Sequence, residues 1–151
     1  MANRRTISDM RMGYDMYERH QAVGTLLGTD LDGTVLDVGG LAGGLRRFMP
    51  AASVVALNVD GTGDMTYAGD NLPFDDCSFD VVVSLDTLEH VPPAGRGHFM
   101  TECARVARRT LLVAAPYGAP GHSAYEEKLD NLYRDVHGEY HRWLHEHVLN
   151  G

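Results

Sequence analysis

Residues Thr34–Leu45, with the sequence TVLDVGGLAGGL, carry the strongest structural signal in the chain. The segment Thr34–Val38 is short, β-branched and apolar, which is typical of a strand buried on both faces of a parallel sheet. Four glycines follow within six residues: Gly39, Gly40, Gly43 and Gly44. Because glycine has no Cβ, such a turn can be tight and can approach a ligand closely. A short helix over residues 45–49, ending before Pro50, completes a strand–turn–helix unit that binds nucleotides in α/β proteins, although packing alone can also require these glycines.

Length and composition are those of one acidic globular domain. The chain has 151 residues, of which 44% are hydrophobic, and a net charge of −8. This charge argues against a nucleic-acid partner, because nonspecific binding to nucleic acids depends on clustered Lys and Arg. Cys77 and Cys103 match no metal or redox spacing, and no apolar run approaches the ~18 residues of a membrane span. We therefore expect a cytoplasmic protein with no nucleic-acid partner and no membrane span.

Strand-like and helix-like patterns alternate along the rest of the chain. Four further strands are predicted: Ser53–Asn58, Met65–Ala68, Phe79–Leu85 and Thr110–Ala115. Helices are predicted over residues 9–27 behind a Ser8 cap, after Pro92, from a capping box at Ser123, and around Trp143. Alternating strands and helices indicate an α/β fold with a mainly parallel sheet.

Two of these helices carry an apolar stripe. In the first helix, the residues that share a face are Met16, His20, Val23 and Leu27. We expect this face to pack on the sheet, with His20 as a structural residue; the alternative is a lid over the ligand site. In the helix that begins at Ser123, we expect a buried stripe formed by Leu129, Leu132, Tyr133 and Val136.

Two longer motifs resemble one protein family. VLDVGGLAG, at Val35–Gly43, resembles motif I of class I S-adenosylmethionine-dependent methyltransferases. GDNLPFDDCSFDVVVSLDTLEHVPP, at Gly69–Pro93, resembles the signature of the type-11 methyltransferase domain, and Arg105–Pro116 occupies the place of that family's next helix and strand. The resemblance covers residues 30–118. It implies a Rossmann-like methyltransferase fold with strand order 3-2-1-4-5 and helices on both faces, S-adenosylmethionine as cofactor, and methyl transfer to a small-molecule, glycan or lipid-precursor acceptor.

The resemblance also assigns cofactor-binding residues. The motif I residues that would wrap the methionine and ribose part of the cofactor are Asp37, Gly39, Gly40 and Gly43. The segment that would read the adenine is Asp70, Asn71 and Leu72. Ser84 and Asp86 would line the amino-acid end of the cofactor.

The residue that binds the ribose remains open between two candidates. A site of this type needs an acceptor for the ribose hydroxyls at the end of the second strand, about 20 residues after the glycine turn. Asn58 has the closer register, whereas Asp60 keeps a carboxylate, which can accept from both hydroxyls at once. We favour Asp60, with Asn58 as the alternative.

Glu89 and His90 lie where the family places groups near the transferred methyl, so we predict that they are catalytic. A base is needed only if the acceptor must lose a proton, and the alternative is that His90 packs beneath the following helix. His137, His141 and His145 recur at helical spacing, with His147 close by, and one face of histidines could hold zinc or copper. Because no cysteine or ordered carboxylate set completes such a site, we predict no metal.

Three features depart from the family pattern. Leu41 replaces the middle glycine of motif I, the adenine segment is shorter than usual, and the sequence up to Gly151 contains no final antiparallel strand pair. We therefore expect a fragment or an unusually short member, and the alternative to an enzyme is a catalytically inactive binding or structural module. A dinucleotide-binding oxidoreductase is a weaker alternative, because Leu41 breaks its glycine pattern and the motif at Gly69–Pro93 has no role in it.

We divide the chain into an N-terminal helical segment, residues 1–28, and a methyltransferase domain, residues 29–151. The strand Thr110–Ala115 would lie at a sheet edge without the charge or bulge that usually protects an edge. The last helix adds an apolar patch formed by Trp143, Leu144 and Val148. We therefore expect a homodimer that buries this edge and this patch.

Overall fold

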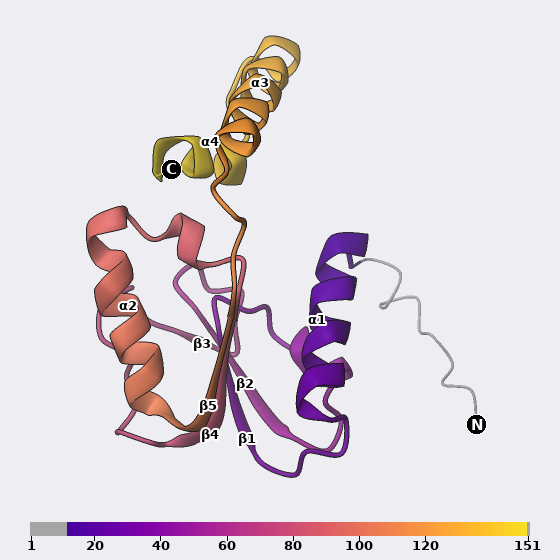
Figure 1. Cartoon of the computed structure of the whole chain (residues 1–151), viewed down its shortest axis with the longest axis vertical. Helices are drawn as coiled ribbons and strands as arrows, with labels where there is room; N and C mark the ends of the chain where they lie inside the picture. Colours follow the sequence, from indigo (N-terminus) through magenta and orange to yellow (C-terminus); the bar gives the residue numbers. More distant parts are fainter. Residues whose placement is uncertain (1–11, 151) are drawn as a thin grey trace, which may run out of the picture.

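A five-stranded parallel sheet forms the centre of the computed structural model, which describes residues 12–150 (Figure 1). The strands are β1 (Thr34–Val38), β2 (Ser53–Asn58), β3 (Met65–Thr66), β4 (Phe79–Leu85) and β5 (Ala107–Ala114). The helices are α1 (Tyr14–Leu27), α2 (Pro93–Val106), α3 (Pro120–His137) and α4 (Arg142–Asn150), with 3-10 turns η2 (Leu45–Arg47) and η3 (Leu88–His90). The strand order is β3-β2-β1-β4-β5, and every described strand pair is parallel, so the predicted fold class is confirmed.

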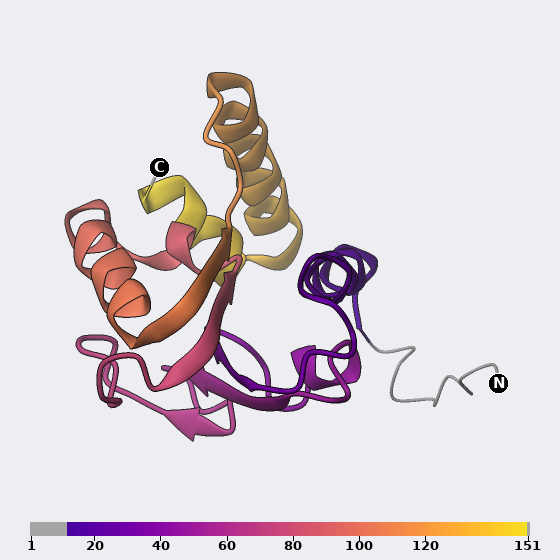
Figure 2. The ribbon, with the colours of Figure 1, turned by 60° about the horizontal axis from the view of Figure 1, so that its bottom comes forward.

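α1 and α2 cover opposite faces of the sheet (Figures 1 and 2). Successive residues of a strand point to opposite faces, and both faces of the central strands are buried. The hydrophobic cluster beneath α2 includes Leu36, Val38, Val82, Phe99 and Val106. The cluster beneath α1 includes Val23, Val35, Leu45, Val81 and Val83. This division of β1 between two cores is the reason for its three buried apolar residues, Val35, Leu36 and Val38.

The predicted packing face of α1 is confirmed. Val23 and His20 are buried, and Nδ1 of His20 is 2.7 Å from the carbonyl oxygen of Met16, which supports a structural role for this histidine. The helix begins at Tyr14, with Gly13 as its N-cap, rather than at residue 9. The predicted Ser8 cap lies outside the described residues.

Several other boundaries differ from the prediction. The helix before Pro50 is only the single turn η2, because Met49 leaves it to enter the core. β5 begins at Ala107 rather than Thr110, since it continues directly from the end of α2. The capping box at Ser123 is wrong: α3 begins at Pro120, whose fixed φ suits the first position of a helix.

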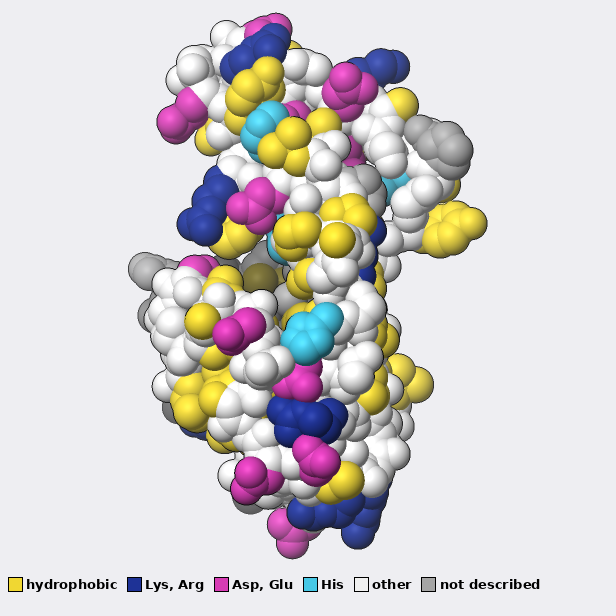
Figure 3. All heavy atoms as spheres, turned by 90° about the vertical axis from the view of Figure 1, so that its left-hand side faces the viewer, with side chains coloured by type: hydrophobic (Ala, Val, Ile, Leu, Met, Phe, Trp, Pro, Cys, Tyr) yellow, Lys and Arg dark blue, Asp and Glu magenta, His cyan; other side chains and the backbone are white. Residues whose placement is uncertain are grey.

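α3 and α4 form a hairpin beyond the carboxyl ends of the strands, and α4 rests on η3 (Figure 1). From the side, the hairpin is an upper lobe above the α/β body, with hydrophobic side chains near the narrower region between them (Figure 3). The predicted burial of the α3 stripe is wrong, because α3 packs chiefly on α4: Leu132 and Val136 are 59% and 68% exposed. Neither α3 nor any other helix within residues 12–150 combines the length and apolarity needed to cross a bilayer.

Candidate functional site

The glycine turn after β1 is closely packed at two positions, Gly39 and Gly40. Gly39 has a φ of +85°, and a Cβ there would lie 2.0 Å from Oγ1 of Thr87. Its N–H donates to the carbonyl oxygen of Leu57, at 2.7 Å. A Cβ on Gly40 would lie 2.1 Å from Oδ2 of Asp37. The turn is therefore fixed against the ends of β1, β2 and β4.

The outer side of the same turn is open. Gly43 has a φ of +74°, and no described atom lies within 4 Å of the position that its Cβ would occupy. Leu41, which replaces the middle glycine of the motif, is 41% exposed and does not fill this space. Backbone at Gly43 can therefore approach a ligand closely.

Asp37, at the end of β1, is a buried carboxyl group without a full set of partners. It is 1% exposed, and its Oδ2 has no hydrogen-bond partner among the described residues. Burial, with a smaller contribution from the charge of Asp64, raises the pKa of Asp37 to about 7. An ionised carboxylate is costly in such a place unless it is paired. A ligand that brings a positive charge or a hydroxyl group to this turn therefore fits Asp37.

Asn58, one candidate for the ribose, is occupied in holding the glycine turn. Its Nδ2 donates to the carbonyl oxygens of Gly39 and Gly40, at 3.0 and 3.4 Å. Its Oδ1 accepts from the N–H of Val59, at 2.8 Å. Both ends of the amide therefore have partners within the protein.

Asp60, the favoured candidate, keeps an exposed charge. Its Oδ1 accepts from the hydroxyl and the N–H of Thr62, at 2.6 and 3.0 Å, and these bonds lower the pKa of the carboxyl group. The carbonyl oxygen of Thr62 accepts from the N–H of Ala42, at 3.0 Å, which ties this loop to the glycine turn. Asp60 thus lies in a loop attached to the turn.

The three residues predicted to read the adenine differ in their surroundings. Asp70 and Asn71 are exposed. Leu72 is buried; its N–H donates to Oε2 of Glu102 at 2.9 Å, and its carbonyl oxygen accepts from Arg105 at 3.0 Å. The backbone of Leu72 is therefore hydrogen-bonded to side chains of α2, whereas Asp70 and Asn71 are accessible to a ligand.

Of the two site residues predicted at the end of β4, Asp86 contacts α1. Asp86 has a φ of +48°, uncommon for a residue other than glycine, and its carboxylate forms an ion pair with Arg19. Sequence reasoning missed Arg19, because no local pattern relates α1 to β4. Ser84, the other residue predicted there, is fully buried, and its hydroxyl has no hydrogen-bond partner within the described part of the chain.

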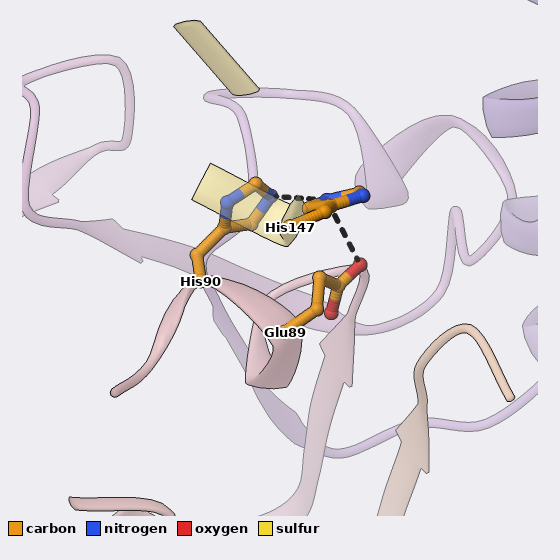
Figure 4. Close-up of side chains that lie close together, drawn as sticks. All are labelled: Glu89, His90 and His147. Carbon is orange, nitrogen blue, oxygen red and sulfur yellow. Dashed lines mark hydrogen bonds and ion pairs between the residues drawn. The ribbon is translucent and has the colours of Figure 1, made fainter. Parts of the chain in front are cut away.

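Glu89 and His90 of η3 meet His147 of α4 (Figure 4). Nε2 of His147 is 3.3 Å from Nε2 of His90 and 3.9 Å from Oε1 of Glu89. One ligand atom from each of these three side chains lies within 4.8 Å of the other two. Both carboxylate oxygens of Glu89 are buried without a hydrogen-bond partner in the described structure. We call Glu89, His90 and His147 the η3–α4 cluster.

In this cluster, the Nδ1 atom of each imidazole ring lies within hydrogen-bonding distance of a carboxylate oxygen. Nδ1 of His90 is 3.0 Å from Oε2 of Glu146, and Nδ1 of His147 is 2.9 Å from Oε1 of Glu126. The indole of Trp143 packs edge-on against the His90 ring, with centroids 5.1 Å apart. His90 therefore lies against α4 rather than beneath α2, the helix that follows it.

Sequence reasoning found Glu89 and His90 but missed their partners, because α3 and α4 are distant in sequence from η3. The three histidines noted for their helical spacing do not form one face. His137 ends α3, His141 precedes α4, and Nδ1 of His145 is 2.7 Å from Oδ2 of Asp130. Gly138, in the left-handed conformation, breaks the helix between them.

A cavity of about 190 Å³ adjoins the η3–α4 cluster. Glu89 and His147 both line it, together with Arg96, Pro116, His122 and Glu126. This mixture of charged and apolar groups suits a small polar molecule.

Comparison with known proteins adds a family and a fold. The sequence profile of the methyltransferase domain family Methyltransf_11 matches residues 19–113, a range that contains the glycine turn, β4 and η3. No curated protein sequence matches the chain significantly.

Solved structures with the same fold span several organisms. A protein from Pyrococcus horikoshii OT3 is 17% identical with a TM-score of 0.62, covering 80% of this chain and 63% of that one. A protein from Bacillus halodurans C-125 assigned as a methyltransferase is 22% identical with a TM-score of 0.55, covering 92% and 66%. An S-adenosylmethionine-dependent methyltransferase from Aquifex aeolicus is 20% identical with a TM-score of 0.50, covering 78% of each chain. The chain thus spans about two thirds of the length of the first two proteins. At these sequence identities, the similarity establishes a shared fold only.

The family profile covers more than half of the chain and includes the glycine turn, the end of β2 and the residues after β4. The five-stranded sheet has the order β3-β2-β1-β4-β5, and the solved structures named above share its overall fold. The chain belongs to the type-11 methyltransferase domain family of the class I S-adenosylmethionine-dependent methyltransferases.

Proposed function

We propose that this chain transfers a methyl group from S-adenosylmethionine to a small-molecule acceptor, a class in which we include glycans and lipid precursors. The observation that supports this most is the Asp37 carboxyl group, buried and partly unpartnered beneath a glycine turn whose outer side is open at Gly43. The cofactor carries an ammonium group and ribose hydroxyls, which are the kinds of partner that Asp37 lacks.

The main task of the chain in such a reaction is positioning. S-adenosylmethionine supplies a methyl group on a sulfonium sulfur, and the bond to the acceptor forms as the carbon–sulfur bond breaks. Holding the two reactants in line accounts for much of such a rate enhancement. Asp37 and the turn Gly39–Gly43 would hold the methionine and ribose part, and Asp60 would accept from the ribose hydroxyls. Asp70 and Asn71, both exposed, would contact the adenine.

The acceptor would enter the cavity beside η3. Glu89 lines this cavity and His90 is next to it in sequence, which supports their predicted place near the transferred methyl. Glu89 has the unpartnered oxygens, whereas Nδ1 of His90 faces Glu146. If the acceptor must lose a proton, Glu89 is therefore the better placed of the two to receive it.

Calorimetry on the full chain tests the cofactor directly. S-adenosylmethionine, S-adenosylhomocysteine and NAD would be titrated in one series. We expect the first two to bind and NAD not to bind. Asp60→Asn should weaken binding by about 1.5–3 kcal/mol, roughly tenfold to a hundredfold, because hydrogen bonds to a charged group are lost.

Asp32→Asn is the matched control, since Asp32 is exposed and precedes β1, at the opposite end of the sheet from the turn. Binding should be unchanged in this variant. If neither sulfur nucleotide binds to the folded protein, the proposed function is wrong. If Asp60→Asn binds normally while Asn58→Ala does not, the ribose assignment moves to Asn58.

The acceptor itself can be sought with a deuterated methyl donor. The full chain would be incubated with methyl-deuterated S-adenosylmethionine and an extract of small molecules, and products would be read by mass spectrometry. A mass shift that requires the protein would identify the acceptor. Asp37→Ala, which removes the carboxyl group from the cofactor site, should abolish most of this signal.

A further inference from the structure

Two imidazole nitrogens of the η3–α4 cluster face one another at a short distance. A carboxylate can only accept, so Glu146 and Glu126 each favour a proton on the Nδ1 atom that faces them. In the neutral tautomer, Nε2 of each ring then carries a lone pair and no hydrogen. These two Nε2 atoms lie 3.3 Å apart and point toward one another (Figure 4). Two lone pairs at this distance repel unless a proton or a metal ion lies between them.

Glu89 adds negative charge at the same place. Its Oε1 is 3.9 Å from Nε2 of His147, its side chain is 11% exposed, and neither of its oxygens has a hydrogen-bond partner in the described residues. A buried carboxylate without hydrogen bonds is costly. A cation bound between these three groups would offset both the charge of the buried carboxylate and the repulsion between the two nitrogen lone pairs.

We propose that Glu89, His90 and His147 bind a divalent transition metal of the zinc class. Two zinc-bound nitrogens, each about 2.0–2.1 Å from the metal at a tetrahedral angle, lie about 3.3–3.4 Å apart. The separation of the two Nε2 atoms is 3.3 Å, so the rings already have this spacing. Oε1 of Glu89 has only to close from 3.9 Å toward the same value.

The surroundings have the second layer that metal-bound histidines require. A ligating histidine usually donates its other ring N–H to a carboxylate, which fixes the ring and its tautomer. Glu146 does this for His90, and Glu126 does it for His147, at 3.0 and 2.9 Å. Two imidazoles and one carboxylate favour zinc, cobalt or nickel over magnesium or calcium, which prefer oxygen ligands.

Three protein ligands leave a fourth position open, as in catalytic zinc sites. Glu89 and His147 line the cavity of about 190 Å³, so the metal would border the space proposed for the acceptor. It would also fasten α4 to η3, since its ligands come from both elements. Glu89 could therefore act as the general base proposed above only in the metal-free protein. The metal site itself does not rest on the proposed methyl transfer, because it needs no cofactor.

Metal binding can be measured on the full chain, freed of metal and of any histidine tag. Zn²⁺ and Co²⁺ would be titrated by calorimetry, Mg²⁺ would serve as the ion that should not bind, and the visible spectrum of bound Co²⁺ would report four-coordination. We expect close to one Zn²⁺ or Co²⁺ per chain. Glu126→Gln, which replaces the carboxylate beside the His147 ring with a neutral amide, should weaken binding by about 10–100-fold, and His147→Gln should weaken it further.

His141→Gln is the matched control, because His141 is an exposed histidine just before the same helix. It should bind metal as the wild type does. The proposal is overturned if the wild type takes up no metal, or if His147→Gln and Glu89→Gln bind as tightly as the wild type. Circular dichroism identifies a variant that does not fold, and Glu126→Gln then decides the question. S-adenosylhomocysteine binding is measured separately, so failure of the metal site and failure of the proposed function are distinguishable.

Discussion

Gly39 and Gly43 have similar φ angles, +85° and +74°, but only Gly39 is pressed against another segment. Gly43→Ala should cost about 1–2 kcal/mol, because an L-residue is strained at positive φ. Gly39→Ala also places a Cβ 2.0 Å from Oγ1 of Thr87, and overpacking typically costs a further 1–3 kcal/mol or so. Urea denaturation should therefore show a larger loss in the free energy of unfolding for Gly39→Ala. Equal losses would mean that the turn is not packed against Thr87.

From the raised pKa of Asp37, we predict that the protein without cofactor becomes less stable as the pH rises. The pKa of Asp37 is raised from 3.8 to about 7 in the folded state. Between these values the folded protein keeps a proton that the unfolded chain releases, so the free energy of unfolding falls with pH until about 7 and then stays level. Asp37→Asn, which cannot ionise, should lack this contribution.

Thermal unfolding of both proteins at about pH 5 and about pH 8 checks the sign. The melting temperature of Asp37→Asn minus that of the wild type should be greater at about pH 8 than at about pH 5. A difference in melting temperature that is the same at both pH values would contradict the raised pKa.

The tight turn after β1 was predictable from sequence, because four glycines follow the strand within six residues. Gly40 lies against Asp37 within the turn, whereas Gly39 lies against Thr87, which is distant in sequence. Leu72 belongs to an equally clear motif, but Glu102 of α2 accepts from its backbone. A contact between segments that far apart leaves no local pattern, so sequence reasoning could not separate Leu72 from its exposed neighbours.

Helix α2 fixes the segment after β3 through one bidentate ion pair. Nε and Nη2 of Arg105 donate to the two carboxylate oxygens of Glu102, both at 2.8 Å. The same guanidinium donates to the carbonyl oxygens of Leu72 and Phe74, at 3.0 and 2.8 Å. Hydrogen bonds from Arg105 are the main cause that lowers the pKa of Glu102 to about 2. The adenine side of the proposed cofactor site is thus anchored to a helix.

Glu102→Gln should lower the melting temperature by several degrees at neutral pH, because Arg105 loses its charged partner. The depressed pKa means that this stabilisation is present above the ordinary value of 4.5 and is lost as the pH falls toward about 2. The gap between variant and wild type should therefore close in acid. Glu127→Gln, at an exposed position of α3, is the control. A gap that persists in acid would rule out this ion pair as its cause.

The strands were easier to predict from sequence than the C-terminal helices. β1 and β4 are buried on both faces, so their mainly apolar sequences indicate both a strand and a central place in the sheet. The stripe of α3 correctly predicts which residues share a face. It cannot tell what covers that face, and in the structure Leu132 and Val136 remain exposed. For the same reason the meeting of His147 with Glu89 had no signal in the sequence.

The exposed stripe of α3 supports the predicted homodimer, but it favours an interface on the α3–α4 hairpin over one at the edge of β5. Leu129, Leu132 and Val136 border an apolar groove completed by Trp143 and Leu144. β5 remains a sheet edge, paired with β4 on its inner side. Pairing of two such grooves would bury an apolar surface in an isologous contact, as most homodimers do.

Light scattering at ~100 μM should give the mass of a dimer, since an interface above ~1,000 Å² is normally stable at such concentrations. Leu132→Glu should give a monomer, because it places a charge in the groove. Leu26→Glu is the matched control: Leu26 is 73% exposed, on α1, and its variant should remain dimeric. A monomeric wild type would contradict the dimer.

The most direct test of the account is a crystal structure of the full chain with S-adenosylhomocysteine. We predict that the nucleotide lies across the carboxyl ends of β1 and β2, with its amino-acid end over Asp37 and the glycine turn and its ribose hydroxyls at Asp60. Electron density for the nucleotide elsewhere on the molecule, or its absence from this edge of the sheet in crystals saturated with it, would contradict the account.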